Sequence, residues 1–337
     1  MTEYFVTTRN IKRAGQSRVY GTEIAEPTYV IAAEDATTMT PDDRVRGRNA
    51  GLRWGRKVVE EAKLKWAAAN PNIPNSTEQQ GDIVVFIHGF NVDAQEAFET
   101  HKTLANNLQA GGLTDAVFVS YSWPANGDVL SYIEDDSDAR ETAVHLVKSA
   151  LAVFAQLSTP ECRVKVHVMA HSMGCLVVRE ALRSAPGSKL TRDGAWGITN
   201  LITFGADISV RSVRRSDGDR LIGKSQRYTN YFNRHDGVLA TSNAKRFATA
   251  CRLGRHGAPS SRLDEMVDID VTQRWEAVED QFPSGVVERV SASHNFYFSD
   301  TQFGKDAADT IKGLLDRRLI PTRDDREVEA GRLRLKP

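Results

Sequence analysis

One apolar run, Ile83–Ile87, constrains the fold of this 337-residue chain more than any other feature. Every position of the run is apolar, so both faces of the strand that it predicts must be covered by other elements. Strands covered on both faces are typical of parallel sheets with helices on each side. Strand-like and helix-like patterns alternate along the rest of the chain. The sequence therefore predicts an open, mostly parallel α/β sheet.

The alternation extends over most of the chain. Runs of apolar and β-branched residues predict further strands at Tyr4–Thr8, Thr28–Ala32, Ala116–Ser120, Val164–Met169, Leu201–Phe204, Tyr228–Phe232 and Val267–Val271. Apolar residues at helical spacing predict helices at Arg44–Ala69, Ala94–Leu108, Ala143–Leu157, Met173–Arg183 and Ala307–Leu315. A turn-rich stretch at residues 68–81 separates the N-terminal part from the rest.

Composition excludes several classes of protein. The chain has 44 Lys and Arg against 44 Asp and Glu, so it is not expected to bind nucleic acid or an anionic membrane by bulk electrostatics. Its 3 cysteines are too few for a disulfide scaffold and lack the spacing of a zinc site, so neither a metal nor a cofactor is expected. No signal peptide and no membrane span is predicted. We expect a cytoplasmic protein.

A serine stands between a predicted strand and a predicted helix in the segment Ala170–Gly174, AHSMG. This pattern differs by one methyl group from the Gly-x-Ser-x-Gly turn that exposes a nucleophilic serine. Strand and helix cross closely at such a turn, so the residues two before and two after the serine must be small. Ser172 is therefore a candidate nucleophile. The alternative is a serine that only caps the helix beginning at Met173.

The loop after residues 83–87 supplies candidates for an oxyanion hole. Acyl transfer needs two backbone N–H groups that face the oxyanion of the tetrahedral intermediate. We expect one from Met173, the residue after the serine, and the other from Phe90 in this loop. Gly89 would allow the backbone to approach a substrate closely. We interpret His88, which precedes the serine, as a polar residue that ties down the loop.

A base and an acid are expected after the serine, in the order Ser, Asp, His. His294 stands in a polar stretch that we expect to be a loop, just before the C-terminal helix, where the base of such a site belongs. His256 is expected to be solvated in its own loop. The turn at the serine is expected to direct the side chain of His171 elsewhere.

Two aspartates compete for the role of the acid. Asp236 follows the predicted strand at residues 228–232, and Asp207 follows the preceding one at residues 201–204. The position after the later strand favours Asp236, and Asp207 remains the alternative. Either residue could instead bond its own backbone in a turn.

Two aromatic residues are candidates for the substrate pocket. Trp123 closely follows the predicted strand Ala116–Ser120, and Tyr132 follows in a polar loop. For Trp123, a place at the edge of the core fits equally well. Residues 243–262 read as loop-rich, either as a gate over the site or as a surface excursion.

Taken together, these pieces resemble the α/β-hydrolase superfamily, and within it a bacterial branch of unknown function with esterase-like triads. The matching segments occur in the expected order: YFVTTR at residues 4–9, VVFIHGFN at 84–91, SWP at 122–124, AHSMG at 170–174, LITFGADIS at 201–209, DGVL at 236–239 and HNFY at 294–297. The resemblance implies the α/β-hydrolase fold, a mostly parallel central sheet with helices on both faces. It also implies that Ser172, Asp236 and His294 form a catalytic triad.

The expected activity is hydrolysis of a small-molecule carboxylic ester through an acyl-enzyme on Ser172, with His294 as general base and acid and Asp236 orienting it. A thioesterase, an amidase or peptidase with the same triad, and a non-catalytic binding protein of this fold remain alternatives. The natural substrate and the oligomeric state cannot be derived from the sequence.

Because the site residues from 90 to 294 must converge, we expect one core domain. Residues 1–80 are expected to form an extension of strands and a helix packed on it, and residues 81–321 the α/β-hydrolase catalytic core. Residues 322–337 are expected to be a charged, solvated C-terminal tail.

Overall fold

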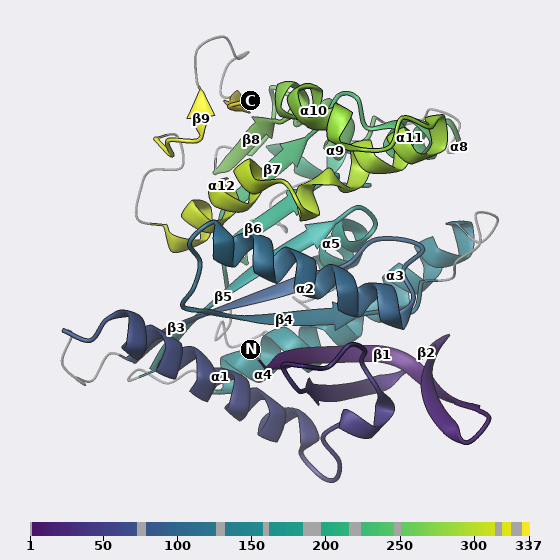
Figure 1. The fold of residues 1–337 in the computed structure, drawn as a ribbon, viewed down its shortest axis with the longest axis vertical. Coiled ribbons are helices and arrows are strands. Elements are labelled where there is room, and N and C mark those ends of the chain that lie inside the picture. Colours follow the sequence, from purple (N-terminus) through teal and green to yellow (C-terminus); the bar gives the residue numbers. More distant parts are fainter. Residues whose placement is uncertain are drawn as a thin grey trace. The chain divides into compact units, whose positions relative to one another are not determined.

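The computed structural model describes residues 2–72, 79–125, 132–157, 162–184, 197–215, 224–245, 251–263, 265–313, 319–324 and 332–337 (Figure 1). The chain divides into two compact units, each assembled from several stretches of sequence. The first unit contains residues 1–102, 115–168 and 176–199, and the second contains residues 103–114, 169–175 and 200–337. This division differs from the expected boundary near residue 80, since residues on both sides of it belong to the first unit.

The first unit is built on strands in the order β2 (Ser17–Ala32), β1 (Glu3–Ala14), β4 (Ala116–Ser122), β3 (Gln79–Ile87) and β5 (Cys162–His171). β1 and β2 form an antiparallel hairpin, whereas β1 runs parallel to β4 and β4 parallel to β3. Every residue from 83 to 87 is buried, as predicted for a strand covered on both faces. The expected mostly parallel sheet with helices is confirmed.

The N-terminal hairpin is longer than the sequence indicates. Most residues from 11 to 23, at the outer end of the hairpin, are exposed, so no apolar alternation marks this part of the two strands. Gly15 makes the turn with φ +61°, a conformation that glycine adopts without strain. β2 is the outermost strand of the order and includes Pro27, and the pairing of β1 with β2 shifts register at Thr7/Arg9 and Arg9/Ile11.

The helical elements of the first unit cover most of the predicted stripes, and residues 41–43 and 132–142 are helical as well, although no stripe predicted them. They are η1 (Pro41–Asp43), α1 (Ala50–Ala69), the first half of α2 (Ala94–Ala110), α3 (Tyr132–Leu146), the π-helical turn Val147–Leu151, α4 (Ala152–Leu157) and most of α5 (Gly174–Ser184). α1 begins at Ala50 and not at Arg44, because Asn49 adopts a left-handed conformation with φ 60°. Its buried face includes Trp54, Val58 and Ala62.

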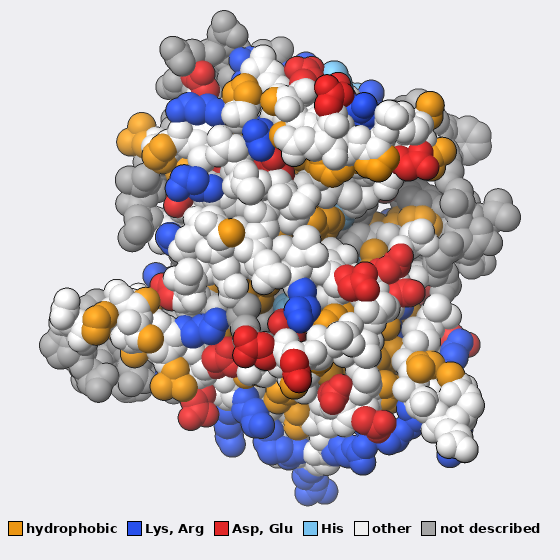
Figure 2. Space-filling model, in the orientation of Figure 1, with side chains coloured by type: hydrophobic (Ala, Val, Ile, Leu, Met, Phe, Trp, Pro, Cys, Tyr) orange, Lys and Arg blue, Asp and Glu red, His pale blue; other side chains and the backbone are white. Residues whose placement is uncertain are grey.

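Charge is unevenly distributed on the first unit. Figure 2 shows Lys and Arg side chains gathered over the start of α1 and the loop before it. The exposed basic residues there are Arg46, Arg48, Arg53, Arg56 and Lys57. The net charge of zero therefore conceals a local basic surface.

The second unit contains the C-terminal end of β5, followed in order by β6 (Ile198–Phe204), β7 (Ser225–Phe232), β8 (Met266–Asp270), β10 (Arg332–Leu335) and β9 (Arg323–Asp324). β7, β8 and β10 run parallel, and β9 is antiparallel to β10. The helical elements are η5 (Val210–Val213), α8 (Gly237–Lys245), α9 (Leu253–His256), α10 (Thr272–Val278), η6 (Glu279–Gln281), α11 (Val286–Asn295), η7 (Phe296–Phe298) and α12 (Thr301–Lys312).

The described C-terminal residues, 322–324 and 332–337, do not form the solvated tail that we expected. β9 and β10 are strands of the sheet, Leu333 and Leu335 are buried, and Arg323 pairs with Asp306 of α12 at 2.6 Å. The segment Arg332–Leu335, RLRL, alternates in the way a half-buried strand does. Two apolar residues among charged neighbours are too few to predict a strand.

The described part of residues 243–262 contains more helix than we expected from its loop-rich sequence. The end of α8 and all of α9 lie within them, while residues 246–250 lie outside the described part. Leu253 is buried, and its N–H donates to the carbonyl of Ile208 at 2.8 Å. This part of the segment therefore packs into the second unit. Within the described residues, no helix is long and apolar enough to cross a membrane.

Candidate active site

Ser172 lies in a sharp turn between β5 and α5. Its φ of 53° puts it in the left-handed region, which a non-glycine residue rarely occupies. Its N–H donates to the carbonyl of Phe204 at 3.3 Å, and its carbonyl accepts from the N–H groups of Cys175 and Asp207, both at 3.1 Å. Such strain costs about 1–3 kcal/mol and is found mainly where function requires it. The main chain thus holds the serine in the strained turn expected for a nucleophile.

His294 and Asp236 are in direct contact. The Nδ1 atom of His294 lies 2.6 Å from Oδ2 of Asp236, and both side chains are buried. The other carboxylate oxygen of Asp236 accepts from the N–H of Leu239 at 2.8 Å, so the start of α8 fixes the carboxylate. An Nδ1 that faces a carboxylate carries the hydrogen, which leaves Nε2 to exchange protons.

The contact changes the proton affinity of the imidazole. Burial alone would lower the pKa of His294, but the charge and hydrogen bond of Asp236, together with the charge of Asp207, more than offset this effect, so the pKa lies above its usual value. The raised pKa means that Asp236 stabilises the imidazolium form, which a general base must adopt during catalysis.

His294 lies on the last turn of α11 and not in the loop that we predicted. The side chains of α11 are mostly polar or exposed, and Val286 and Val287 are 81% and 76% exposed, so no buried stripe marks the helix. Its C-terminal end is held to the loop of the acid. The side-chain amide of Asn233 donates to the carbonyl of Ser293 at 2.9 Å, and the N–H of Gly237 donates to the hydroxyl of Ser293 at 3.0 Å.

Asp207, the alternative acid, is engaged elsewhere. Its carboxylate accepts from the hydroxyl of Ser242 at 3.0 Å and lies 3.2 Å from Nε of Arg252, close enough for an ion pair. Arg252 and Asp207 are both buried. The geometry therefore favours Asp236 over Asp207 as the partner of His294.

The side chain of His171 does not point away from the site, contrary to our expectation. It is buried, and its Nε2 lies 3.0 Å from the main-chain oxygen of His294. The two rings lie 4.6 Å apart between centroids. This contact joins residues 123 positions apart in the chain, and nothing in the local sequence signals it.

The first unit contains the loop that was expected to supply an oxyanion donor. His88 Nδ1 bonds the carbonyl of Gly89 at 2.9 Å, and its Nε2 accepts from the N–H of Trp123 at 3.2 Å. Burial and the charge of Arg9 lower the pKa of His88 to about 3, so the ring stays neutral. The interpretation of His88 as a residue that ties down this loop is confirmed.

Arg9 holds the same loop from β1. Its guanidinium donates to the carbonyl of Val92 and, through Nε, to the hydroxyl of Ser122 at 3.0 Å. Burial lowers the pKa of Arg9 to about 10. Phe90 belongs to this loop, whereas Met173 belongs to the second unit, and their joint role as oxyanion donors stays a prediction.

The two candidate pocket residues, Trp123 and Tyr132, were both placed by their position after a predicted strand. Trp123 is fully buried and stacked on His88, with ring centroids 5.7 Å apart, which fits a place at the edge of the core. Its Nε1 donates to the carbonyl of His88 at 2.9 Å. Tyr132 is the first residue of α3 and does not lie in the polar loop that we expected, and its side chain lies outside the described residues.

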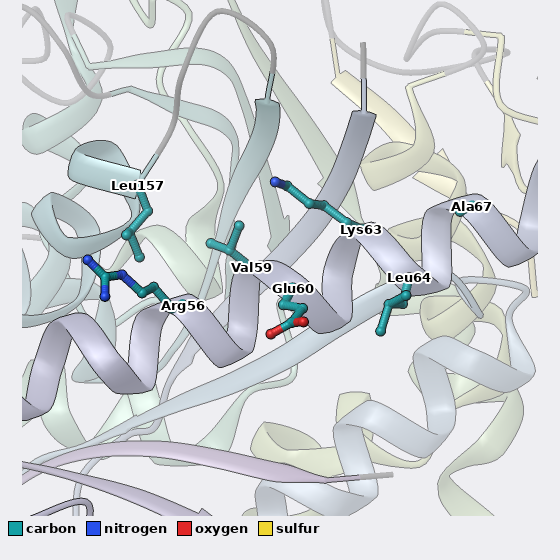
Figure 3. Close-up of a pocket in the computed structure, with 7 residues that line it drawn as sticks. All are labelled: Arg56, Val59, Glu60, Lys63, Leu64, Ala67 and Leu157. Carbon is teal, nitrogen blue, oxygen red and sulfur yellow. The ribbon is translucent and has the colours of Figure 1, made fainter. Parts of the chain in front are cut away.

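Two surface hollows contain none of the predicted site residues. One of about 600 Å³ runs along α1 and is closed at one end by Leu157 of α4 (Figure 3). The other, of about 200 Å³, is lined by Arg234, Arg255 and His256. His256 is exposed there, in line with the expectation that it is solvated. Among the described residues, no group of three or more His, Cys, Asp or Glu is placed to hold a metal ion.

Comparison with known proteins gives a family match. Residues 66–276 match the family described as alpha/beta hydrolase of unknown function. The uncharacterized protein alr1448 of Nostoc sp. (strain PCC 7120 / SAG 25.82 / UTEX 2576) is 28% identical in an alignment of 118 residues that covers 28% of this chain and 29% of that protein. The match thus spans less than a third of the length of that relative.

Two solved structures show a distant similarity. Aspergillus fumigatus lipase B is 14% identical with a TM-score of 0.29, over 60% of this chain and 47% of the lipase chain. Trichoderma reesei cutinase, in complex with a C11Y4 phosphonate inhibitor, is 16% identical with a TM-score of 0.24, over 45% of this chain and 67% of the cutinase chain. Similarity at this level does not bear on the function of this chain.

Proposed function

Because the chain belongs to the family described as alpha/beta hydrolase of unknown function, we propose that it is a serine hydrolase that cleaves carboxylic esters. The proposal rests chiefly on the 2.6 Å contact between His294 Nδ1 and Asp236 Oδ2. Both residues belong to the same unit as Ser172 and its left-handed turn. An acid that orients a base, together with a serine in a strained turn, is the arrangement that acyl transfer requires.

In the proposed mechanism, the hydroxyl of Ser172 attacks the ester carbonyl while Nε2 of His294 takes its proton. Asp236 stabilises the imidazolium that forms. The N–H of Met173 is the first expected oxyanion donor, and the N–H of Phe90 is the second. His294 then gives its proton to the leaving alcohol, and water releases the acyl group from Ser172 by the same steps in reverse.

The test replaces Ser172 by alanine. We expect Ser172→Ala to fold normally and to lose ester hydrolysis by a factor on the order of 10⁶, measured with p-nitrophenyl esters. A fluorophosphonate probe should label wild-type protein at Ser172, as read by mass spectrometry. Ser184→Ala, at the far end of α5, is the matched control and should keep full activity.

Two results would contradict the proposal. Full activity in purified Ser172→Ala would exclude the serine as nucleophile, and folded wild-type protein that resists labelling would favour a non-catalytic binding protein. An acyl group offered as p-nitrophenyl ester, thioester and p-nitroanilide then separates the reaction classes. We expect the ester to give the highest kcat/KM.

A further inference from the structure

His171 connects the two segments that the proposed reaction has to keep in register. It is the last residue of β5 and directly precedes Ser172. Its Nε2 lies 3.0 Å from the carbonyl oxygen of His294. A carbonyl oxygen can only accept, so Nε2 of His171 carries the hydrogen. A side chain beside the nucleophile thus bonds the main chain of the base.

Packing leaves the His171 ring little freedom to choose another partner. The ring is 4% exposed and lies between Phe204 and Phe298, with centroids at 5.0 Å and 4.9 Å. Gly205, with φ +53°, makes room for it, because a Cβ there would lie 3.2 Å from Nε2 of His171 and 3.2 Å from Cε1 of His294. A close-packed ring of this kind holds its donor at a fixed point.

His294 is therefore held at two different points. Asp236 bonds its Nδ1 and sets the rotation of the imidazole, whereas His171 bonds its carbonyl and sets the main chain at the end of α11. The last carbonyls of a helix have no partner within it, so this bond also satisfies a group that the helix leaves open. Each contact constrains a degree of freedom that the other leaves free.

We propose that His171 is a positioning residue that keeps the base in line with the nucleophile. The inference rests on the proposed function and extends it to a residue that touches neither the ester nor the transferred proton. Loss of the bond lets the main chain of His294 shift, and a misplacement of about 1 Å can cost about 10² in rate. Because no substrate contact changes, kcat should fall while KM stays.

The experiment compares variants that keep or remove the donor. His171→Phe keeps a ring but has no N–H, and it should lower kcat and the rate of fluorophosphonate labelling of Ser172 by about 10–10² at unchanged KM. His171→Gln has an amide N–H at about the reach of Nε2 and should recover most of both rates. His171→Asn has a shorter amide that cannot reach, so it should behave like His171→Phe.

The matched control is His167→Leu. His167 is also buried on β5, and its Nε2 bonds the side chain of Asp82 at 2.8 Å, a residue remote in sequence from both Ser172 and His294. Its replacement should lower the unfolding midpoint but not the kcat of the folded protein. The midpoint of each His171 variant, measured in parallel, separates lost folding from lost alignment.

The possible outcomes separate this inference from the proposed function. Activity that survives in Ser172→Ala overturns the proposed function whatever the His171 variants do. If Ser172→Ala is inactive, wild-type kcat in folded His171→Phe or His171→Asn overturns the inference alone. An equal loss in His171→Gln and His171→Phe also overturns it, because the donor would then be irrelevant. Should His171→Phe fail to fold, the comparison of Asn with Gln decides.

Discussion

Asp236 and Asp207 are both buried aspartates at the ends of neighbouring strands, yet their surroundings give them different partners. Asp236 faces an imidazole and the N–H of Leu239, so its charge is directed at a group that gains and loses a proton. Asp207 faces Arg252 and Ser242, groups that keep their protons. A carboxylate paired with a permanent cation has a structural role, and one paired with a histidine can assist proton transfer.

We therefore predict different consequences for the two Asp→Asn substitutions. Asp236→Asn should lower kcat by about 10⁴, because an amide no longer holds the required tautomer of His294. Asp207→Asn should leave Arg252 buried without its counter-charge and lower the free energy of unfolding by about 3–5 kcal/mol, with a smaller loss of kcat. Steady-state kinetics and urea unfolding of both variants check this. A larger loss of kcat in Asp207→Asn would reassign the acid.

The same pair governs the pH dependence. The base must be neutral to act, so kcat/KM should rise with pH through the pKa of His294, at a midpoint above the ordinary value of about 6.5. Asp236→Asn removes the main raising effect and leaves burial, so its midpoint should fall, and Asp207→Asn should move it less. The contact between Asp236 and protonated His294 also adds to the free energy of unfolding. This contribution is fully present below about pH 6.5 and is lost as the pH rises through the pKa of His294 in the folded protein.

At the scale of single residues, the sequence was sufficient to predict those residues whose type the proposed chemistry requires. Small residues two positions either side of Ser172, and the chain order Ser, Asp, His, follow from the geometry of one strand-end site, which is why AHSMG, Asp236 and His294 could be singled out. The contact of His171 could not be predicted. It depends on the direction of one side chain at a strand end and on where α11 brings the His294 carbonyl.

At the scale of elements, burial decided what could be predicted. The strand Ile83–Ile87 and the helix Ala94–Ala110 bury clear stripes, and the sequence located both. The outer part of the β1–β2 hairpin, α11 and the strand Arg332–Leu335 bury few side chains each, so periodicity was too weak to reveal them. Neighbouring elements, and not local preference, fix such segments.

The C-terminal strands are held by a buried ion pair that can be tested. Arg323 of β9 contacts Asp306 of α12, and both side chains are fully buried. Arg323→Ala should lower the free energy of unfolding by about 3–5 kcal/mol, since Asp306 keeps its buried charge without a counter-charge. Lys305→Ala is the control. Its pair with Asp309 spans 3.8 Å on the surface, with the lysine 54% exposed, and should contribute less than about 0.5 kcal/mol.

Chemical denaturation measures both variants. If Arg323→Ala lost no more stability than Lys305→Ala, the C-terminal residues would be acting as the tail that their charge suggested. The comparison is matched because both changes remove one cation from an ion pair with α12.

At the scale of the whole molecule, the chain passes repeatedly between the two units. The division falls between residues 102 and 103, 114 and 115, 168 and 169, 175 and 176, and 199 and 200. The second unit therefore depends on two short inserted segments, one of which contains Ser172. Periodicity describes one element at a time, so it could not show which distant segments share a unit.

We predict that residues 200–337 do not fold alone, although they form most of the second unit. They lack Asn107, whose buried amide donates to the carbonyls of Tyr297 at 3.2 Å and Asp300 at 2.9 Å. They also lack Gly111, whose backbone packs so closely on Gly304 that a Cβ would lie 2.6 Å from its oxygen. The isolated fragment should show no cooperative transition in urea, whereas the full chain should. A sigmoidal transition of the fragment would refute this dependence.

The outermost strands of the two units have a consequence for behaviour in concentrated solution. β2 contains Pro27, between Glu26 and Thr28, and pairs with shifted register, and β9 is only two residues long, so neither presents a regular edge to which another chain could add. Behind the hairpin lies β4, in which all seven residues are buried. If the hairpin detached, the edge of β4 would be uncovered, and its sequence AVFVSYS is rich in β-branched and aromatic residues, which favour pairing with another strand. The N-terminal hairpin thus covers a strand edge that would otherwise be open to pairing with another chain.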